Sequence, residues 1–186
     1  MRDDIRDRES LLAAIRRGER PKYLFFWGHQ APREGGIGKH CLSQWWMAPF
    51  VVEGVRYVAA EHFMMAEKAR LFGDDESLAE ILAATHPGGA KSLGRQVRGF
   101  DETAWEKARF DVVVRGNEAK FAQNPELGEY LRATGERVLV EASPVDRVWG
   151  IGLAENDPGA GDPAAWRGLN LLGFALMEVR RRLRGR

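Results

Sequence analysis

One stretch of the chain carries most of the information: Tyr57-Val-Ala-Ala-Glu-His-Phe-Met-Met-Ala-Glu-Lys-Ala-Arg70. Its apolar residues, among them Phe63, Ala66 and Ala69, follow the 3.6-residue period of a helix and predict one over residues 59–72 with one core face. Glu61 lies in the first turn, beside His62. A carboxylate there can simply stabilise the helix dipole, or it can act as an acid or base on a rigid element. The stretch alone leaves both roles open.

The segments around this stretch predict further helices and a few short strands. Apolar periodicity, caps and Gly or Pro stops predict an amphipathic helix over 3–18 and later helices over 75–84, 88–97, 102–122, 125–134 and 166–184. Strands are predicted at 22–27 and 137–142, a hairpin at 50–58, a loop at 28–40 and an exposed loop at 150–163. The predicted fold is mainly α, with a few short β-strands, in a single domain over residues 1–186.

Bulk composition narrows the class of protein. The chain has 186 residues, of which 44% are hydrophobic and 30% charged, as in globular proteins. A formal net charge of +1 gives no global attraction for long nucleic acid, although it leaves a local basic groove possible. The single cysteine, Cys41, excludes an internal disulfide, and no apolar run is long enough to span a membrane. The charged amino terminus lacks the apolar region of a signal peptide, so the sequence predicts a cytoplasmic protein without membrane partners.

Several familiar motifs are incomplete. Gly35-Gly-Ile-Gly-Lys39 lacks the first glycine of a phosphate loop, where Arg33 stands, and the hydroxyl residue after the lysine, where His40 stands. Glu61-His62 is not a zinc motif, because that motif needs two histidines one turn apart. Ser43 lacks the glycines that flank a hydrolase nucleophile. These patterns give no support to a nucleotide triphosphatase, a zinc enzyme or a serine hydrolase.

Two acids are better candidates for chemistry. Glu61 begins an apolar helix, and Asp146 follows the predicted strand at 137–142, close to Trp149. A pair of carboxylates from distant segments suits glycoside hydrolysis, in which one group stabilises an oxocarbenium-like centre and another handles water or the leaving group. Spacing alone does not establish such a pair, because exposed or capping acids are more common.

Taken in order, several segments resemble the YbiA-like, or NADAR, family. They are Leu42-Ser-Gln-Trp-Trp-Met-Ala-Pro-Phe50, Ala60-Glu-His-Phe-Met-Met-Ala-Glu-Lys-Ala69, Leu93-Gly-Arg95, Trp105, Lys120-Phe121, Thr134-Gly135, Leu139-Val-Glu141, Asp146, Trp149-Gly150, Asn170-Leu-Leu-Gly173 and Leu176-Met-Glu-Val-Arg180. Each is weak alone, but their order makes the resemblance specific from about residue 25 to 183, with residues 1–20 as an amino-terminal helical extension. Gln44 and Trp45 depart from the family's usual Asn and Phe, which leaves the shape of the ring pocket open.

The resemblance implies a compact multihelical fold and an N-glycosidase that cleaves ribosyl–nitrogen bonds, with no cofactor and no metal. Two substrate classes follow from it: ADP-ribose on guanine bases of nucleic acid, and phosphorylated ribosylamino-pyrimidine intermediates of riboflavin synthesis. It implies catalytic roles for Glu61, Asp146 and Trp105. Residues implied to bind substrate or support the site are Ser43, Lys68, Arg95, Lys120, Trp149 and Asn170.

Two other functions use the same residues. A binding module would hold ADP-ribose or NAD without cleaving it, and a structural protein would use Glu61 only as an acid at a helix start. The joint presence of Glu61, Trp105 and Asp146 favours the enzyme. His62 lies about 100° around the helix from Glu61, so we expect it to pack or support the pocket.

Overall fold

The computed structural model describes residues 5–31 and 35–185. Its contacts divide the chain into two compact units. We call Met1–Ser43 with Glu129–Arg186 the first unit, and Gln44–Gly128 the second unit. The prediction of one domain over the whole chain stays a prediction.

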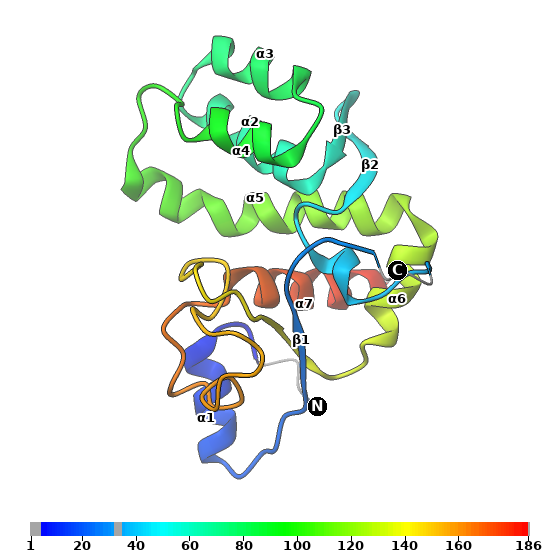
Figure 1. Ribbon diagram of the computed structural model, residues 1–186, viewed down its shortest axis with the longest axis vertical. Coiled ribbons are helices and arrows are strands. Elements are labelled where there is room, and N and C mark those ends of the chain that lie inside the picture. The colour runs from blue at the N-terminus through cyan, green and yellow to red at the C-terminus, as the bar shows by residue number, and fades with distance from the viewer. Residues whose placement is uncertain (1–4, 32–34, 186) are drawn as a thin grey trace. The chain divides into compact units, whose positions relative to one another are not determined.

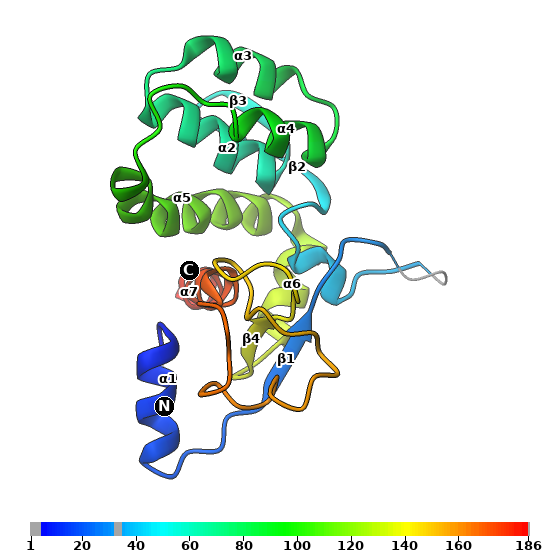
Figure 2. The same ribbon diagram turned by 60° about the vertical axis from the view of Figure 1, so that its left-hand side comes forward.

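The second unit is a helical layer with a hairpin. Strands β2 (Met47–Val52) and β3 (Val55–Ala59) pair antiparallel, and β3 runs directly into helix α2 (Ala60–Leu71). Helices α3 (Asp75–Ala83), α4 (Pro87–Gly94) and α5 (Glu102–Gln123) follow, and all three pack on α2. Figures 1 and 2 show α3 and α4 on one side of α2 and α5 on its other side.

Helix α2 is the centre of the second unit. Every residue from Ala60 to Ala66 is buried, so the helix has no solvent face along its first two turns. The expected single core face is therefore wrong for this part, because neighbours cover α2 on several sides. Gly116 of α5 allows a close approach: a Cβ there would lie 2.5 Å from the ring of Phe63.

The first unit is built on a parallel strand pair. Strand β1 (Tyr23–Phe26) pairs in parallel with β4 (Val138–Glu141), which places Phe26 opposite Glu141. Helix α7 (Leu171–Arg184) packs on β4. The unit also contains α1 (Arg8–Arg16) and a short 3-10 helix, η1 (Lys39–Leu42), whereas α6 (Pro125–Ala133) begins in one unit and ends in the other.

Most predicted elements are present with slightly different ends. Within the described residues the chain has seven α-helices and two two-stranded sheets, so the mainly helical prediction is confirmed. The helix predicted over 3–18 is α1, and residues 3 and 4 lie outside the described residues. Helix α4 ends at Gly94, earlier than predicted, and η1 overlaps the end of the predicted 28–40 loop.

Two predictions for the carboxyl-terminal third are wrong. The last helix begins at Leu171 and not at Trp166, because Gly168 is pressed against backbone and Asn170 adopts a left-handed conformation with φ 55°. The 150–163 segment is not an exposed loop throughout. Ile151, Leu153 and Ala160 are buried in it, and Trp166 donates its indole N–H to the carbonyl of Ala160 at 2.8 Å.

Candidate functional site

Glu61 occupies a fixed place at the start of α2. It is only 3% exposed, and its backbone N–H donates to the carbonyl of Gln44 at 3.0 Å. Ala59, the residue before the helix, has no side chain that could cap it. The Gln44 carbonyl therefore replaces part of the missing cap, and the positive end of the helix dipole favours the negative charge of Glu61.

A buried amide pair holds Gln44 in turn. Asn117 of α5 is fully buried and donates from Nδ2 to Gln44 Oε1 at 2.7 Å and to the carbonyl of Val113 at 2.8 Å. Its Oδ1 is buried and accepts no hydrogen bond from the described residues. Asn117 was not among the predicted site residues, although a polar residue between Val114 and Phe121 on an apolar helix face was a usable signal. The departure at Gln44 thus has a partner that fits its longer side chain.

Lys68 and Arg95 lie at the carboxyl-terminal ends of α2 and α4, which are bonded to each other. Lys68 donates from Nζ to the carbonyl of Gly94 at 2.7 Å, and its Nζ lies 4.2 Å from the centre of the Phe100 ring. Burial lowers the pKa of Lys68. Arg95 follows as the C-cap residue of α4 and is exposed. Lys68 therefore links two helices, and Arg95 is the more accessible of the two cations.

Trp105 and Lys120 both lie on α5, but near opposite ends of the helix. Trp105 is 8% exposed in the first turn, and Lys120 is fully buried near the last turn. Trp105 precedes Asn117 by twelve residues, which is about 18 Å along a helix axis. Lys120 follows Asn117 by one turn. Within the second unit, Lys120 is therefore closer than Trp105 to the end of α5 that is bonded to Gln44.

The first unit holds Asp146 in a tightly bonded loop after β4. Asp146 Oδ1 accepts from the N–H groups of Val148 and Trp149, each at 2.8 Å, and the Asp146 N–H donates to Ser143 Oγ at 3.1 Å. Asp146 Oδ2 makes no hydrogen bond within the described residues. One oxygen of the carboxylate thus shapes the loop, and the other remains available to a ligand.

The same framework fixes Trp149 and Asn170. Asn170 is fully buried; its Oδ1 accepts from the N–H of Glu141 and its Nδ2 donates to the carbonyl of Leu139, both at 2.9 Å. The carbonyl of Trp149 accepts from the N–H of Leu172 at 3.2 Å. Asn170 therefore joins β4 to the start of α7 and supports the structure of the site.

Ser43, also in the first unit, is the C-cap residue of η1 and is half-buried.

His62 packs as expected, in the second unit. It is 2% exposed, and its Nε2 lies 3.0 Å from the carbonyl of Ala84. Burial lowers the pKa of His62, which favours the neutral ring that donates from Nε2.

Among the described residues there is no group of three or more His, Cys, Asp or Glu side chains arranged to hold a metal ion. None of the described helices has the length and apolar character needed to cross a membrane.

The family model for the NADAR domain matches residues 25–184 of this chain. The chain belongs to the NADAR domain family. The predicted family is thereby confirmed, and the matched residues include every predicted site residue. The NADAR match begins after α1.

Three relatives of known name are similar in sequence to this NADAR chain. N-glycosidase R617 of Acanthamoeba polyphaga mimivirus is 42% identical, over 87% of this chain and 96% of its own length. N-glycosidase YbiA of Escherichia coli is 33% identical, over 73% of this chain and 76% of its own length. The chloroplastic riboflavin biosynthesis protein PYRR of Zea mays is 37% identical, over 67% of this chain but 19% of its own length.

The fold agrees with a solved structure in the same group. The NMR structure of E. coli YbiA superposes with a TM-score of 0.69 at 27% identity, over 89% of this chain and 87% of that one. The multihelical YbiA-like fold is therefore confirmed.

Proposed function

We propose that the protein is an N-glycosidase that hydrolyses a ribosyl–nitrogen bond, with Glu61 as the catalytic carboxylate. The hydrolase class rests on two relatives whose names state N-glycosidase, one of them similar over nearly its whole length. The observation that carries the role of Glu61 is a carboxylate, 3% exposed, fixed by its own backbone at the start of α2.

The chemistry follows from the bond that is cleaved. As the base leaves with the bonding electrons, positive charge develops at the anomeric carbon of the ribose. Glu61 stabilises that charge or takes a proton from the attacking water. Water supplies the new hydroxyl on the ribose, and the departing nitrogen gains a proton. The rigid position of Glu61 suits this task, because a fixed carboxylate needs no rearrangement as the charge develops.

The other residues receive narrower roles in this proposal. Asp146 uses its Oδ2 to orient a ribose hydroxyl or the water, since Oδ1 is taken up by the loop. Trp105 binds a part of the substrate remote from the cleaved bond, because α5 separates it from Asn117 by about 18 Å. Exposed Arg95 suits a phosphate oxygen, and an arginine gives a directional contact there.

Two substrate classes remain in the proposal. ADP-ribose on guanine is the first, as the family resemblance implies. Phosphorylated ribosylamino-pyrimidines are the second, and similarity to part of a riboflavin biosynthesis protein favours them. Both present a ribose whose anomeric carbon is bonded to nitrogen, so one carboxylate could serve either.

A paired assay tests the function and selects the substrate. Purified protein is incubated with ADP-ribosyl-guanine DNA and, separately, with a ribosylamino-pyrimidine phosphate, and release of the base is measured. We expect turnover of one of them and its loss in Glu61→Ala and Glu61→Gln. Near-normal release by Glu61→Gln would remove Glu61 from the catalytic role.

The rival binding module has its own signature. Ligand-dependent thermal stabilisation by ADP-ribose, without release of base from any ribosyl substrate, would favour a module that binds and does not cleave. No stabilisation by any ribosyl ligand would favour a structural role.

A further inference from the structure

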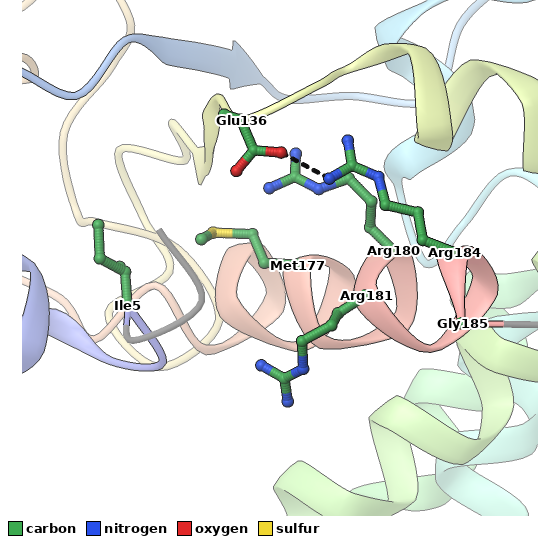
Figure 3. A pocket seen from close by; sticks show the side chains of 7 residues that line it. All are labelled: Ile5, Glu136, Met177, Arg180, Arg181, Arg184 and Gly185. Carbon is green, nitrogen blue, oxygen red and sulfur yellow. Dashed lines mark hydrogen bonds and ion pairs between the residues drawn. The ribbon is translucent and has the colours of Figure 1, made fainter. Parts of the chain in front are cut away.

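A cavity in the first unit combines apolar residues with a buried arginine, and the function proposed above does not use it. Its volume is about 350 Å³, a size typical of small-molecule sites, and its lining includes Ile5, Glu136, Met177, Arg180 and Arg184. Met177, Arg180 and Arg184 recur at i, i+3 and i+7 and so share one face of α7. Figure 3 shows these three side chains extending on the side of Glu136, whereas Arg181 extends from the other side of the helix.

Arg184 and one nitrogen of Arg180 hold the turn between α6 and β4. Arg184 donates from Nη2 to the carbonyl of Gly135 at 2.9 Å. Arg180 donates from Nη1 to Thr134 Oγ1 at 2.7 Å and to the carbonyl of Arg137 at 2.9 Å. Both arginines therefore have a structural role, but that role uses only one of the three guanidinium nitrogens of Arg180.

The other edge of the Arg180 guanidinium has no partner among the described residues. Arg180 is only 5% exposed, and its Nε and Nη2 make no hydrogen bond with any of these residues. The two nitrogens share one edge of the planar group, and their parallel N–H bonds match the two oxygens of a carboxylate. Burial, together with the charge of Arg184, lowers the pKa of Arg180 to about 10, so the guanidinium is still protonated at neutral pH. Water can accept from this edge, but it carries no charge to balance the buried cation.

The charges around the cavity favour an anion with a single charge. Glu136 is the one acid among the described lining residues, and it pairs with Arg184 at 2.6 Å. Arg181, on the other side of α7, pairs with Glu178. These pairs leave the charge of Arg180 to be balanced. A dianion such as phosphate would bring a second negative charge close to Glu136, whereas one carboxylate supplies the missing charge without that repulsion.

Apolar side chains define the rest of the ligand. Ile5 is buried, and the half-buried Met177 lies about one turn before Arg180 on α7. A methionine is flexible enough to pack against ligands of different shapes. The cavity is much larger than a carboxylate group, so its remaining volume suits an apolar body attached to that group.

We propose that this cavity binds a small organic monocarboxylate, with the carboxylate on the Nε and Nη2 edge of Arg180 and the apolar body against Met177 and Ile5. It is a second ligand site, it lies wholly within the first unit, and it does not rest on the proposed glycosidase function. A ligand that binds only the folded chain stabilises it, so occupation of the cavity should raise the melting temperature.

The test uses the purified full chain and hydrocinnamate, a monocarboxylate with an apolar body. Isothermal titration calorimetry gives the dissociation constant, and thermal melting checks the expected stabilisation. Three control compounds separate the parts of the ligand: the amide of hydrocinnamate lacks the charge, acetate lacks the apolar body, and inorganic phosphate is an oxyanion of another class. We expect each control compound to bind about tenfold or more weakly than hydrocinnamate, because each loses the charged hydrogen bonds or the apolar contacts.

Two substitutions of lining residues locate the ligand. Arg180→Gln removes the carboxylate-binding edge and should weaken hydrocinnamate binding about tenfold or more, as for loss of hydrogen bonds to a charged group. Because Arg180→Gln also loses bonds to the turn between α6 and β4, Met177→Glu is a second variant. It places a carboxylate about one turn from Arg180, where it should occupy the free edge and abolish binding. Thermal melting without ligand shows whether each variant is folded.

A pair of acid substitutions separates the cavity from the overall charge. Glu136→Gln removes the acid nearest to the bound carboxylate and should tighten binding by about two- to fivefold, the range for a partly exposed charge pair. Glu178→Gln is the matched control, since it makes the same change in net charge on α7 but does not line the cavity. We expect it to leave the dissociation constant nearly unchanged.

No binding of hydrocinnamate by the wild type would overturn the proposal, and so would equal binding of its amide. Preference for inorganic phosphate would overturn the choice of a carboxylate. Unchanged binding by folded Arg180→Gln or Met177→Glu, or equal effects of Glu136→Gln and Glu178→Gln, would place the ligand elsewhere and so contradict it. None of these measurements involves a ribosyl substrate, so their outcome is independent of base release by the proposed glycosidase.

Discussion

Glu61 and Asp146 each lie just after a strand, but different atoms hold them in place. Glu61 is carried by a helix whose first two turns are buried on all sides, and its own backbone N–H is bonded to Gln44. Asp146 lies in a loop whose shape depends on its own carboxylate, through the N–H groups of Val148 and Trp149. The contrast teaches that Glu61 is held in place through its backbone, whereas Asp146 is held in place through its own carboxylate.

The largest effect should come from Glu61→Gln. The amide keeps the shape of the side chain but cannot take a proton or stabilise a positive centre. We expect base release to fall by about 10²–10⁴-fold, the range for loss of an acid–base group. The melting temperature should stay close to that of the wild type. A melting temperature that falls together with activity would break the contrast, because it would make Glu61 a structural residue.

Two substitutions of Asp146 should differ from one another. Asp146→Asn keeps an oxygen for Val148 and Trp149, so it should reduce activity with little change in stability. Asp146→Ala removes that acceptor and leaves two N–H groups without their partner. We expect Asp146→Ala to lower the free energy of unfolding by about 1–3 kcal/mol, the cost of unsatisfied polar groups. Chemical denaturation of both variants measures the difference, and equal stabilities would refute the role of Asp146 in the loop.

Removal of Asn117 should have a medium effect and test how Glu61 is positioned. Asn117→Ala leaves Gln44 Oε1 without the donor that holds it. We expect a loss of about 1–3 kcal/mol in the free energy of unfolding, together with a lower kcat and a nearly unchanged KM. Asn117→Asp, which keeps an acceptor but loses the donor, should behave similarly. Asn117→Ala with full activity would separate Gln44 from the positioning of Glu61.

The smallest effect should be a pH dependence of stability. Burial lowers the pKa of both His62 and His40 in the folded protein. Because the unfolded chain binds protons more readily, the free energy of unfolding is highest above the ordinary histidine pKa of about 6.5 and falls as the pH drops below it. His62→Gln should flatten this part of the profile. Urea denaturation at several pH values between neutral and mildly acidic provides the measurement.

Helix positions were predictable from the sequence where local chemistry sets them. Asp101 caps α5 through the N–H of Ala104, and Pro87 begins α4, as their sequence positions indicate. The start of α7 was not predictable, because the left-handed turn at Asn170 depends on its bonds to β4, which is distant in sequence. The burial of Ile151 and Leu153 was missed for the same reason, since a Gly- and Pro-rich composition says nothing about packing.

The residues of the candidate site also fall into those that the sequence indicates and those that only the structure reveals. Glu61 and Asp146 could be proposed from an ordered set of motifs. Asn117 left only the signal of a polar residue on an apolar helix face, and its bond to Gln44 appears only in the structure. Lys68 was predicted as a ligand residue, and the structure adds a bond to Gly94 that links two helices. The distance of about 18 Å between Trp105 and Asn117 follows from their spacing on α5, once both residues are known to lie on one helix.

The sequence by itself determined the family, the order of helices and the presence of an acid at the start of α2, because these depend on residue identity and local periodicity. Only the tertiary structure decided that α2 is buried around its first two turns, that one oxygen of Asp146 belongs to its loop, and that arginines of α7 border a cavity. These features depend on contacts between residues far apart in the chain, which no local pattern records.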